Sequence, residues 1–383
     1  MDFNYDLPES HIAKHPPARR EDARLLHVDA SGQWADRGIT DLPELLPGAS
    51  ALWVNETKVL HARLMAVKPT GGVLELLLLE PREVPVEQGL TAKGTVVWNA
   101  MVGGAKKWKS GPLEVPGSGV GLVVAREGDA LRFTWEGEED FGAVLDRLGR
   151  IPLPPYMRRE AEDNDAERYQ TVFARLPGSV AAPTAGLHLT DGLIQTLSDR
   201  SIHCERVTLH VGVGTFKPLT GDVASHTMHG ERCIVGRGAL ARLAEGAEVT
   251  AVGTTTLRTL ESLYWIACRW KSEGIAPDQP LQQWVYREVG EPFAQHSEAM
   301  AWLLEAIGTA DQVEFVTNLM IVPGYRVRSA HRLLTNFHMP NSTLLCIVEA
   351  MIGARWREAY AHAVKNGYRF LSYGDACLLE RCD

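Results

Sequence analysis

The sequence predicts an α/β fold: a mixed or parallel sheet domain with helices, plus an inserted small β-barrel domain. Between about residues 64 and 150, short apolar or alternating runs are separated by Gly, Pro and charged turns, a spacing typical of small barrels or sandwiches. Beyond residue 159, strand patterns alternate with helix patterns, which indicates a parallel or mixed sheet. The stretch GRIPLPPYMRR between the two regions favours an extended linker because prolines interrupt helices and strands. We therefore expect an α/β domain built from residues 1–61 and 153–383, and a barrel-like domain over residues 62–152.

Local patterns predict the elements of the α/β domain. The apolar run Ala51–Val54 predicts a buried strand, and the NETK that follows predicts a turn. Thr190 and Pro340 stand where helices are expected to begin, because Thr caps a helix N-terminus and Pro fits its first turn. In chain order, the later predicted elements are a helix over 190–200, a strand over 204–211, a strand over 249–252 with a turn at 253–255 and a helix over 257–267, a helix over 297–307, and a strand in HRLLTNF before a helix opened by Pro340 and Asn341 or Ser342.

The composition indicates a globular protein. The chain has 383 residues, of which 45% are hydrophobic, so it can bury a sizeable core. Its N-terminus lacks a secretory signal pattern and no segment approaches about 18 uninterrupted apolar residues, so we expect a cytoplasmic protein with no membrane contact. Its six cysteines form no CxxC pair, so neither a disulfide framework nor a zinc site is indicated. We expect reduced thiols and no metal.

Charge and common motifs exclude several functions. A net charge of −9 argues against coating nucleic acid through bulk electrostatics, although it allows a local basic patch. HVGVGTFKP contains a GxG, but the third glycine of a dinucleotide-binding fingerprint is missing and Pro218 interrupts any following helix. The patterns GxxxxGK[ST], HExxH and GxSxG are absent, so ATP hydrolysis, zinc proteolysis and serine hydrolase chemistry lose their usual signals.

Four loops rich in Gly, Thr, Asn and His follow apolar runs. In an open α/β sheet, loops after strands meet at the carboxyl edge, where helix N-termini offer free N–H groups to ligands. Any one loop has a structural explanation, and a lone histidine more often makes a structural hydrogen bond than it catalyses. Together they predict a ligand site at one edge of the sheet. The loops are VAAPTAGLHLT (180–190), LHVGVGTFKP (209–218), VGTTTLRTLES (252–262) and LLTNFHMPNST (333–343).

Eight ordered segments resemble the S-adenosylmethionine:tRNA ribosyltransferase-isomerase family of the queuosine pathway. The likeness runs nearly end to end, and none of the segments consists of common apolar filler. The segments are YDLPESHIA, RYQTVFARLPGSVAAPTAGLHLT, VTLHVGVGTFKPL, HTMHGE, VGTTTLRTLES, PGYR, LLTNFHMPNSTLL and YRFLSYGDACLL.

The resemblance implies a reaction. The ribosyl moiety of S-adenosylmethionine would be transferred and isomerised onto 7-aminomethyl-7-deazaguanine at the tRNA wobble position, giving epoxyqueuosine tRNA with release of adenine and methionine. S-Adenosylmethionine would be a co-substrate, with no prosthetic group and no metal. Its sulfonium acidifies the adjacent ribose C–H, so a base of near-neutral pKa is needed, and the incoming amine needs a second proton acceptor. The catalytic candidates in family-like loops are His188, His210, Glu231, His338 and Asp375.

The same resemblance suggests binding residues. Loop residues could approach the nucleoside and the base, with Gly186 allowing close backbone approach and His188 acting as proton acceptor or orienting donor. Arg258 could face a carboxylate or phosphate, or could merely pair with Glu261 on a helix surface. The substrate-binding candidates are Asn55, Arg63, Thr184, Gly186, Gly212, Gly214, Thr215, Phe216, Gly253, Thr254, Thr255, Arg258, Asn336 and Ser342.

A short basic run in the barrel region is a candidate tRNA contact. Lys106, Lys107 and Lys109 would be an ordinary solvated charge run in an unrelated protein. With Trp108 among them and tRNA as the implied partner, phosphate contacts beside a stacking aromatic become the favoured interpretation.

Three departures from the family pattern keep a second function open. Glu56 and Lys58 stand where relatives usually have Asp and Arg, and Lys cannot make the bidentate contacts of Arg. Residues 264–312 are longer than expected and could cover the active-site edge or form a subunit contact. TNLMIVPGY lacks the aromatic residue that commonly precedes this proline motif. The alternative is a non-catalytic or repurposed paralogue that binds an adenine nucleoside or RNA, and the oligomeric state is left open.

Overall fold

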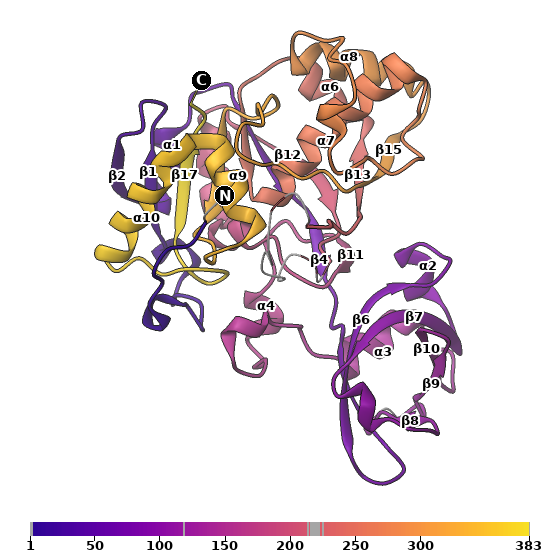
Figure 1. Ribbon diagram of the computed structural model, residues 1–383. Helices are drawn as coiled ribbons and strands as arrows, with labels where there is room; N and C mark the ends of the chain where they lie inside the picture. The colour runs from indigo at the N-terminus through magenta and orange to yellow at the C-terminus, as the bar shows by residue number, and fades with distance from the viewer. Residues whose placement is uncertain (1–2, 118, 213, 215–222, 224–225, 383) are drawn as a thin grey trace.

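The computed structural model describes residues 3–117, 119–212, 214, 223 and 226–382. Among these residues, nine strands form one mixed sheet and six form a closed barrel, which confirms the predicted fold class. Figure 1 shows the barrel to one side of the α/β domain, joined to it by chain segments that run past β4 (Thr57–Val59) and β11 (Leu176–Ser179). None of the described helices is both long and apolar enough to cross a membrane.

The large sheet is built from chain segments on both sides of the barrel. Strands β12, β3, β14 and β16 are parallel neighbours, so their carboxyl ends meet at one edge. The sheet order is β15 (Gln312–Thr317), β13 (Glu231–Gly236), β12 (His203–Leu209), β3 (Ala51–Asn55), β14 (Val249–Val252), β16 (Arg332–Asn336), β17 (Ala376–Glu380), β1 (Arg24–Val28) and β2 (Trp34–Gly38).

The barrel is stabilised by side chains that point into its interior from its strands and from helix α3 (Phe141–Leu148). In β6 (Val73–Pro81), fully buried side chains alternate with more exposed ones, so that Leu74, Leu76 and Leu78 face the barrel core. Phe141, Val144 and Leu145 of helix α3 pack into the same core. The barrel order is β10 (Ala130–Thr134), β7 (Thr95–Val102), β6 (Val73–Pro81), β5 (Arg63–Val67), β8 (Leu113–Glu114) and β9 (Val123–Glu127).

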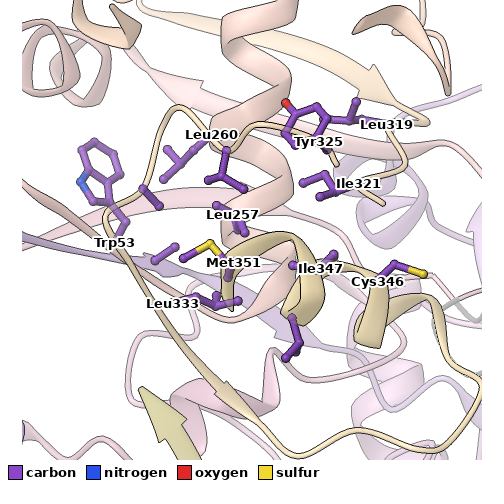
Figure 2. Close-up of a cluster of buried hydrophobic side chains, with 14 of the residues drawn as sticks. Trp53, Leu257, Leu260, Leu319, Ile321, Tyr325, Leu333, Cys346, Ile347 and Met351 are labelled. Atoms are coloured by element: carbon purple, nitrogen blue, oxygen red, sulfur yellow. The ribbon is translucent and has the colours of Figure 1, made fainter. Parts of the chain in front are cut away.

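Helix α7 (Thr254–Glu273) lies at the centre of the α/β core. Its residues from Thr254 to Arg269 are all buried, and it packs on β12, β3, β14 and β16. Side chains of α7 and α9 (Thr343–Ile352) gather with those of β3 and β16 in one cluster (Figure 2). Three of the buried hydroxyls of α7, those of Thr256, Thr259 and Ser262, each donate to the backbone carbonyl four residues earlier.

The other helices cover the sheet and its ends. Helix α5 packs on the opposite face of the sheet from α7, through Leu193 and Leu197, and its N-cap is Thr190 as predicted. All six cysteines are free. The further helices are α1 (Leu42–Leu45), α2 (Val86–Thr91), α4 (Asp165–Arg168), α5 (Asp191–Asp199), α6 (Arg237–Ala244), α8 (His296–Ala306) and α10 (Trp356–Lys365).

Two local predictions are corrected by the structure. The predicted turn NETK contains the start of β4, because Thr57–Val59 pairs in parallel with β11, a strand more than a hundred residues later that local pattern cannot reveal. The long segment 264–312 is not a cover over the sheet edge. Its first ten residues complete the buried helix α7, and α8 packs against α6 and α7.

Candidate active site

Two adjoining cavities lie at the edge where the parallel strands end. The interdomain cavity, about 520 Å³, lies between the barrel and the α/β domain, and the sheet-edge cavity, about 310 Å³, lies within the α/β domain. Val211, Thr254, Thr255 and Leu344 line both, so the two spaces share a wall. Nowhere in the described chain do three or more His, Cys, Asp or Glu side chains form a group that could hold a metal ion.

The shared wall is built around the start of α7. Gly253 connects β14 to this helix with φ +90°, a backbone conformation that residues with a Cβ rarely adopt. The sharp junction brings Thr254 and Thr255 to the surface of both cavities, where each is 7% exposed. The first N–H groups of a helix have no intrahelical partner, so this wall carries donors and a partial positive charge.

A buried ion pair lies one helical turn further into the interdomain cavity. The Arg258 Nη1 donates to Glu231 Oε2, and the two side chains are 7% and 8% exposed. Arg258 Nε donates to the Leu319 carbonyl at 3.2 Å, and Glu231 Oε1 accepts from Gly212 N at 3.4 Å. Arg258 Nη2 has no hydrogen-bond partner in the described part of the chain. The interdomain cavity therefore contains a carboxylate whose two oxygens accept hydrogen bonds and a guanidinium with one nitrogen, Nη2, that makes none with the described residues.

The walls of the interdomain cavity are fixed by two polar contacts. Arg232 Nη1 donates to both carboxylate oxygens of Glu87, each at 3.0 Å, and this pair joins β13 to α2 of the barrel. The Gln283 side-chain amide accepts from Met228 N at 3.0 Å and donates to the His226 carbonyl at 2.7 Å. It thus makes the two hydrogen bonds that the backbone of a paired strand would make. Residues from both domains therefore form one cavity.

Two of the histidines that line the cavities, His210 and His338, are neutral imidazoles. Burial lowers the pKa of His210 to about 4 and that of His338 to about 3. His210 Nδ1 lies 2.9 Å from the Thr57 hydroxyl, whereas its Nε2 has no partner among the described residues. His338 Nε2 lies 3.0 Å from the Thr335 hydroxyl. Of the two, His210 keeps a ring nitrogen uncommitted.

His188 lies behind the cavity wall. The Thr184 hydroxyl donates to Asn336 Oδ1 at 2.8 Å, which turns the amide nitrogen of Asn336 toward His188 Nε2 at 3.1 Å. Nε2 therefore accepts this hydrogen bond. Thr184 and Asn336 line the sheet-edge cavity, but His188 lines neither this cavity nor the interdomain one. His188 therefore contacts Asn336 from outside both cavities, and its expected role as proton acceptor or orienting donor stays a prediction.

Burial of His188 predicts a loss of stability in acid. Burial, reinforced by Arg20 and Arg369, lowers the pKa of His188 to about 4, against an ordinary value of about 6.5. Below pH 6.5 the unfolded chain binds a proton at His188 that the folded chain excludes. The stability that the neutral side chain contributes is therefore fully present above this pH and is lost as the pH falls toward 4. One such histidine should cost about 2 kcal/mol at pH 4.5 relative to pH 7.

We expect His188→Gln to reduce the difference in unfolding free energy between pH 7 and pH 4.5 by that amount, as measured by urea unfolding. The exposed residue His203 provides the matched control, and His203→Gln should leave the difference unchanged. An unchanged pH difference in His188→Gln would show that His188 titrates alike in the folded and unfolded states.

Comparison with known proteins assigns the chain to a family. The family model for the queuosine biosynthesis protein matches residues 1–379. The chain belongs to the queuosine biosynthesis family. An S-adenosylmethionine:tRNA ribosyltransferase-isomerase of Azoarcus sp. (strain BH72) is 41% identical over 390 residues, covering 100% of this chain and 98% of the relative. A protein of the same name from Anaeromyxobacter sp. (strain Fw109-5) is 41% identical over 391 residues, covering 100% and 99%.

A solved structure is also similar. The S-adenosylmethionine tRNA ribosyltransferase of Thermotoga maritima is 26% identical and has a TM-score of 0.47, with 98% of this chain and 99% of that chain covered. The family resemblance inferred from the sequence is confirmed by the family model and the curated relatives.

In this queuosine biosynthesis protein, many of the predicted site residues line the two cavities. Glu231 is the first residue of β13, and the others belong to the four loop segments 180–190, 209–218, 252–262 and 333–343. Thr215 and Phe216 lie outside the described residues. The predicted residues that line a cavity are Thr184, His210, Gly212, Gly214, Glu231, Gly253, Thr254, Thr255, Arg258, Asn336, His338 and Ser342.

Four other predicted residues line neither cavity and have structural contacts. Both carboxylate oxygens of Asp375 accept backbone N–H groups, from Arg24 at 2.9 Å and Arg369 at 2.8 Å. Asn55 joins β3 to β12, because its amide donates to the Leu209 carbonyl and accepts from Leu209 N. Arg63 Nη2 donates to the Leu153 carbonyl at the base of the barrel. Gly186 packs against Thr171, where an added Cβ would meet a methyl group at 3.0 Å.

The structure does not support the expected stacking of Trp108, in the basic run, on an RNA base. Trp108 is 3% exposed, donates its indole N–H to the Gly111 carbonyl at 2.8 Å, and packs in the barrel core. Arg126 lies over its ring, so no face is offered to an RNA base. Lys106, Lys107 and Lys109 are exposed, as phosphate contacts would require.

Of the departures noted in the sequence, Glu56, Lys58 and residues 264–312 lie outside the described cavity lining, whereas Leu319, Met320 and Ile321 of TNLMIVPGY line the interdomain cavity. Glu56 forms ion pairs with Arg175 and Arg206, and Lys58 is exposed. Arg258 pairs with Glu231 and not with Glu261 on a surface, because the whole first part of α7 is buried. The described lining of both cavities contains no residue from 264–312, although Gln283 supports the wall from behind.

The sequence analysis missed the barrel side of the interdomain cavity. Val84 and Met101 line it and are 39% and 51% exposed, which is unusual for large apolar side chains. Period-two alternation could have assigned Met101 to the outer face of its strand. It could not have shown that this face lies opposite His210 and Arg258.

Proposed function

We propose that this protein is a cytoplasmic S-adenosylmethionine:tRNA ribosyltransferase-isomerase. It transfers and isomerises the ribosyl moiety of S-adenosylmethionine onto 7-aminomethyl-7-deazaguanine at the tRNA wobble position, giving epoxyqueuosine tRNA and releasing adenine and methionine. Membership of the queuosine biosynthesis family and the names of its relatives support this reaction. The observation that carries the proposal is the pair of adjoining cavities, of about 520 and 310 Å³, around one helix N-terminus. They offer room for a nucleoside beside a second base.

The interdomain cavity holds groups suited to the proton transfers. The sulfonium of the donor acidifies the neighbouring ribose C–H, and a neutral imidazole can accept that proton. Burial lowers the pKa of His210 to about 4, which is below the near-neutral value that suits the reaction best but keeps the imidazole neutral and able to accept a proton. Thr57 fixes one ring nitrogen, and the other has no partner among the described residues. Glu231 is a second acceptor in the same cavity, oriented by Arg258. We therefore assign the first proton transfer to His210 and the deprotonation of the attacking amine to Glu231.

One assay tests the activity directly. The protein is incubated with S-adenosylmethionine and tRNA that carries 7-aminomethyl-7-deazaguanine. Release of adenine is followed by chromatography, and the mass of the nucleoside product is measured by mass spectrometry. The control is the same tRNA with unmodified guanine, which lacks the attacking amine. Binding of both substrates without adenine release would contradict the proposal and favour the non-catalytic paralogue.

The exposed lysines of the barrel should contribute to tRNA binding. Replacing Lys106, Lys107 and Lys109 together by alanine should weaken tRNA binding, because each lysine that neutralises a phosphate releases counterions. The slope of log affinity against log salt should become shallower by about one for each phosphate that is no longer neutralised. Affinity for S-adenosylmethionine should stay close to wild type, because these residues line neither cavity.

Filter binding over a salt series gives the slope, and calorimetry gives the nucleoside affinity. Lys271→Ala with Lys365→Ala is the control, and losses are compared per lysine removed, since these two exposed lysines belong to the α/β domain. An equal loss of tRNA affinity in this control would assign the effect to net charge and not to the basic run.

A further inference from the structure

Two helices of the α/β domain begin at the shared wall of the cavities without a side-chain cap. Gly253 is the N-cap of α7 and Ser342 is the N-cap of α9, and neither makes a capping hydrogen bond. Serine is among the preferred N-cap residues, yet the buried Ser342 hydroxyl has no partner among the described residues. The first turns of both helices, at Thr254, Thr255 and Leu344, line the cavities. The positive ends of two helices therefore converge on one wall.

Two further donors on α7 point to a ligand at this wall. Thr255 is 7% exposed and lines both cavities, and its hydroxyl has no hydrogen-bond partner among the described residues. Arg258, three residues later, is 6% exposed and its Nη2 is also without a partner in the described chain. Residues three apart share one helix face. A buried polar group without a partner is costly, so two such groups beside two uncapped helix starts indicate a site for a bound acceptor.

The donors at this wall fit an anion. The Glu231 carboxylate shares the interdomain cavity, but Arg258 Nη1 and Gly212 N hold its oxygens, so its charge is already countered. Helix N-termini, a hydroxyl and a guanidinium are the groups that proteins use to bind carboxylate and phosphate. Because Thr255 and Arg258 are more than nine-tenths buried, the anion must be small and terminal. A carboxylate at the end of a substrate meets this condition better than a phosphate held between two riboses.

We propose that this wall is the subsite for the carboxylate of the methionyl group of S-adenosylmethionine. The inference rests on the proposed function and adds the recognition of one substrate group. The Thr255 hydroxyl, the first N–H groups of α7 and α9, and Arg258 Nη2 donate to the carboxylate. The adenosine part then extends from the shared wall into the adjoining space. This subsite distinguishes S-adenosylmethionine from adenosine nucleosides that lack an amino-acid carboxylate.

Binding of two nucleosides in the absence of tRNA tests the subsite. Calorimetry would compare S-adenosylmethionine with its decarboxylated form, which keeps the sulfonium and the amine. Since a hydrogen bond to a charged group is strong, we expect the wild-type protein to bind the decarboxylated form about tenfold to a hundredfold more weakly. Thr255→Val should weaken binding of S-adenosylmethionine about tenfold and leave binding of the decarboxylated form nearly unchanged.

A neighbouring threonine supplies the matched control. Thr256 donates its hydroxyl to the Val252 carbonyl at 2.7 Å and faces away from the cavities, so Thr256→Val should keep the discrimination between the two nucleosides. Equal affinity of the wild-type protein for both would overturn the subsite while the adenine-release assay still succeeds. Weaker tRNA binding by Thr255→Val with unchanged nucleoside discrimination would also overturn it and assign the wall to an RNA phosphate. A wild-type protein that binds neither nucleoside and releases no adenine would contradict the proposed function itself.

Discussion

Arg258→Met should destabilise the protein by about 3–5 kcal/mol, because it leaves the Glu231 carboxylate buried without its cation. The two side chains are 7% and 8% exposed, so water cannot replace the missing partner easily. The double variant Arg258→Met with Glu231→Gln removes both charges. It should recover most of the stability, since replacing a buried pair by neutral groups is often nearly neutral.

The double variant should lose activity although it keeps most of its stability. Single-turnover adenine release by the double variant should be slower by about a hundredfold or more, because a positioned proton acceptor contributes about that factor or more. Urea unfolding of the two single variants and the double variant gives the stability cycle. A loss of less than about 1 kcal/mol in Arg258→Met would show that the Glu231 carboxylate is neutral or solvated, as exposed pairs are worth no more than this. A stable double variant with normal turnover would remove both residues from the mechanism.

The ion pair also shows what sequence can predict about the site. The order strand, Gly253 and helix is predicted because its signals are local: an apolar run, a glycine and leucines at helical spacing. The helix itself is longer than predicted, because it starts at Thr254, inside the predicted turn, and ends at Glu273. Convergence of three of the four loops follows from one topological rule, since β12, β14 and β16 lie in the parallel part of the sheet and end at one edge. The loop 180–190 follows β11, which pairs with β4 outside this sheet, so the rule does not place it. Neither the local signals nor the rule reveals that Arg258 pairs with Glu231, because the carboxylate comes from a strand whose place in the sheet order is not written in local pattern.

Polar residues next to strands show the limit most clearly. Asp375 and His338 both stand in polar loops of family-like segments, and the sequence offers no reason to rank them. In the structure Asp375 uses both oxygens to accept backbone N–H groups, whereas His338 lines the sheet-edge cavity. The difference depends on which distant backbone lies within reach. The same holds for Trp108, whose burial cannot be read from its lysine neighbours because it depends on how the barrel closes over it.

The largest structural effect outside the cavities should come from Glu261. This residue is fully buried on α7, and its carboxylate accepts four hydrogen bonds. The donors are the Tyr325 hydroxyl at 2.6 Å, the backbone N–H groups of Arg328 at 2.8 Å and Ser329 at 2.6 Å, and the Ser329 hydroxyl at 2.5 Å. These four hydrogen bonds, here called the Glu261 latch, fix the loop after β15 to the central helix α7. Tyr325 belongs to the family-like segment PGYR.

Glu261→Ala should destabilise the protein by about 4 kcal/mol, because it leaves these buried donors without an acceptor. Glu261→Gln should cost less, since its amide oxygen can still accept the bonds made to Oε1 while the NH₂ group replaces the acceptor for Tyr325. The control is Glu273→Ala at the exposed end of the same helix, which should change stability by no more than about 0.5 kcal/mol. Urea unfolding measures all three. If Glu261→Ala and Glu273→Ala cost the same, the latch does not hold α7, and the placement of Arg258 one turn earlier must depend on the apolar core alone. If the predicted order is found, adenine release should fall in Glu261→Ala even where it is folded, because α7 carries Thr255 and Arg258 into the cavities.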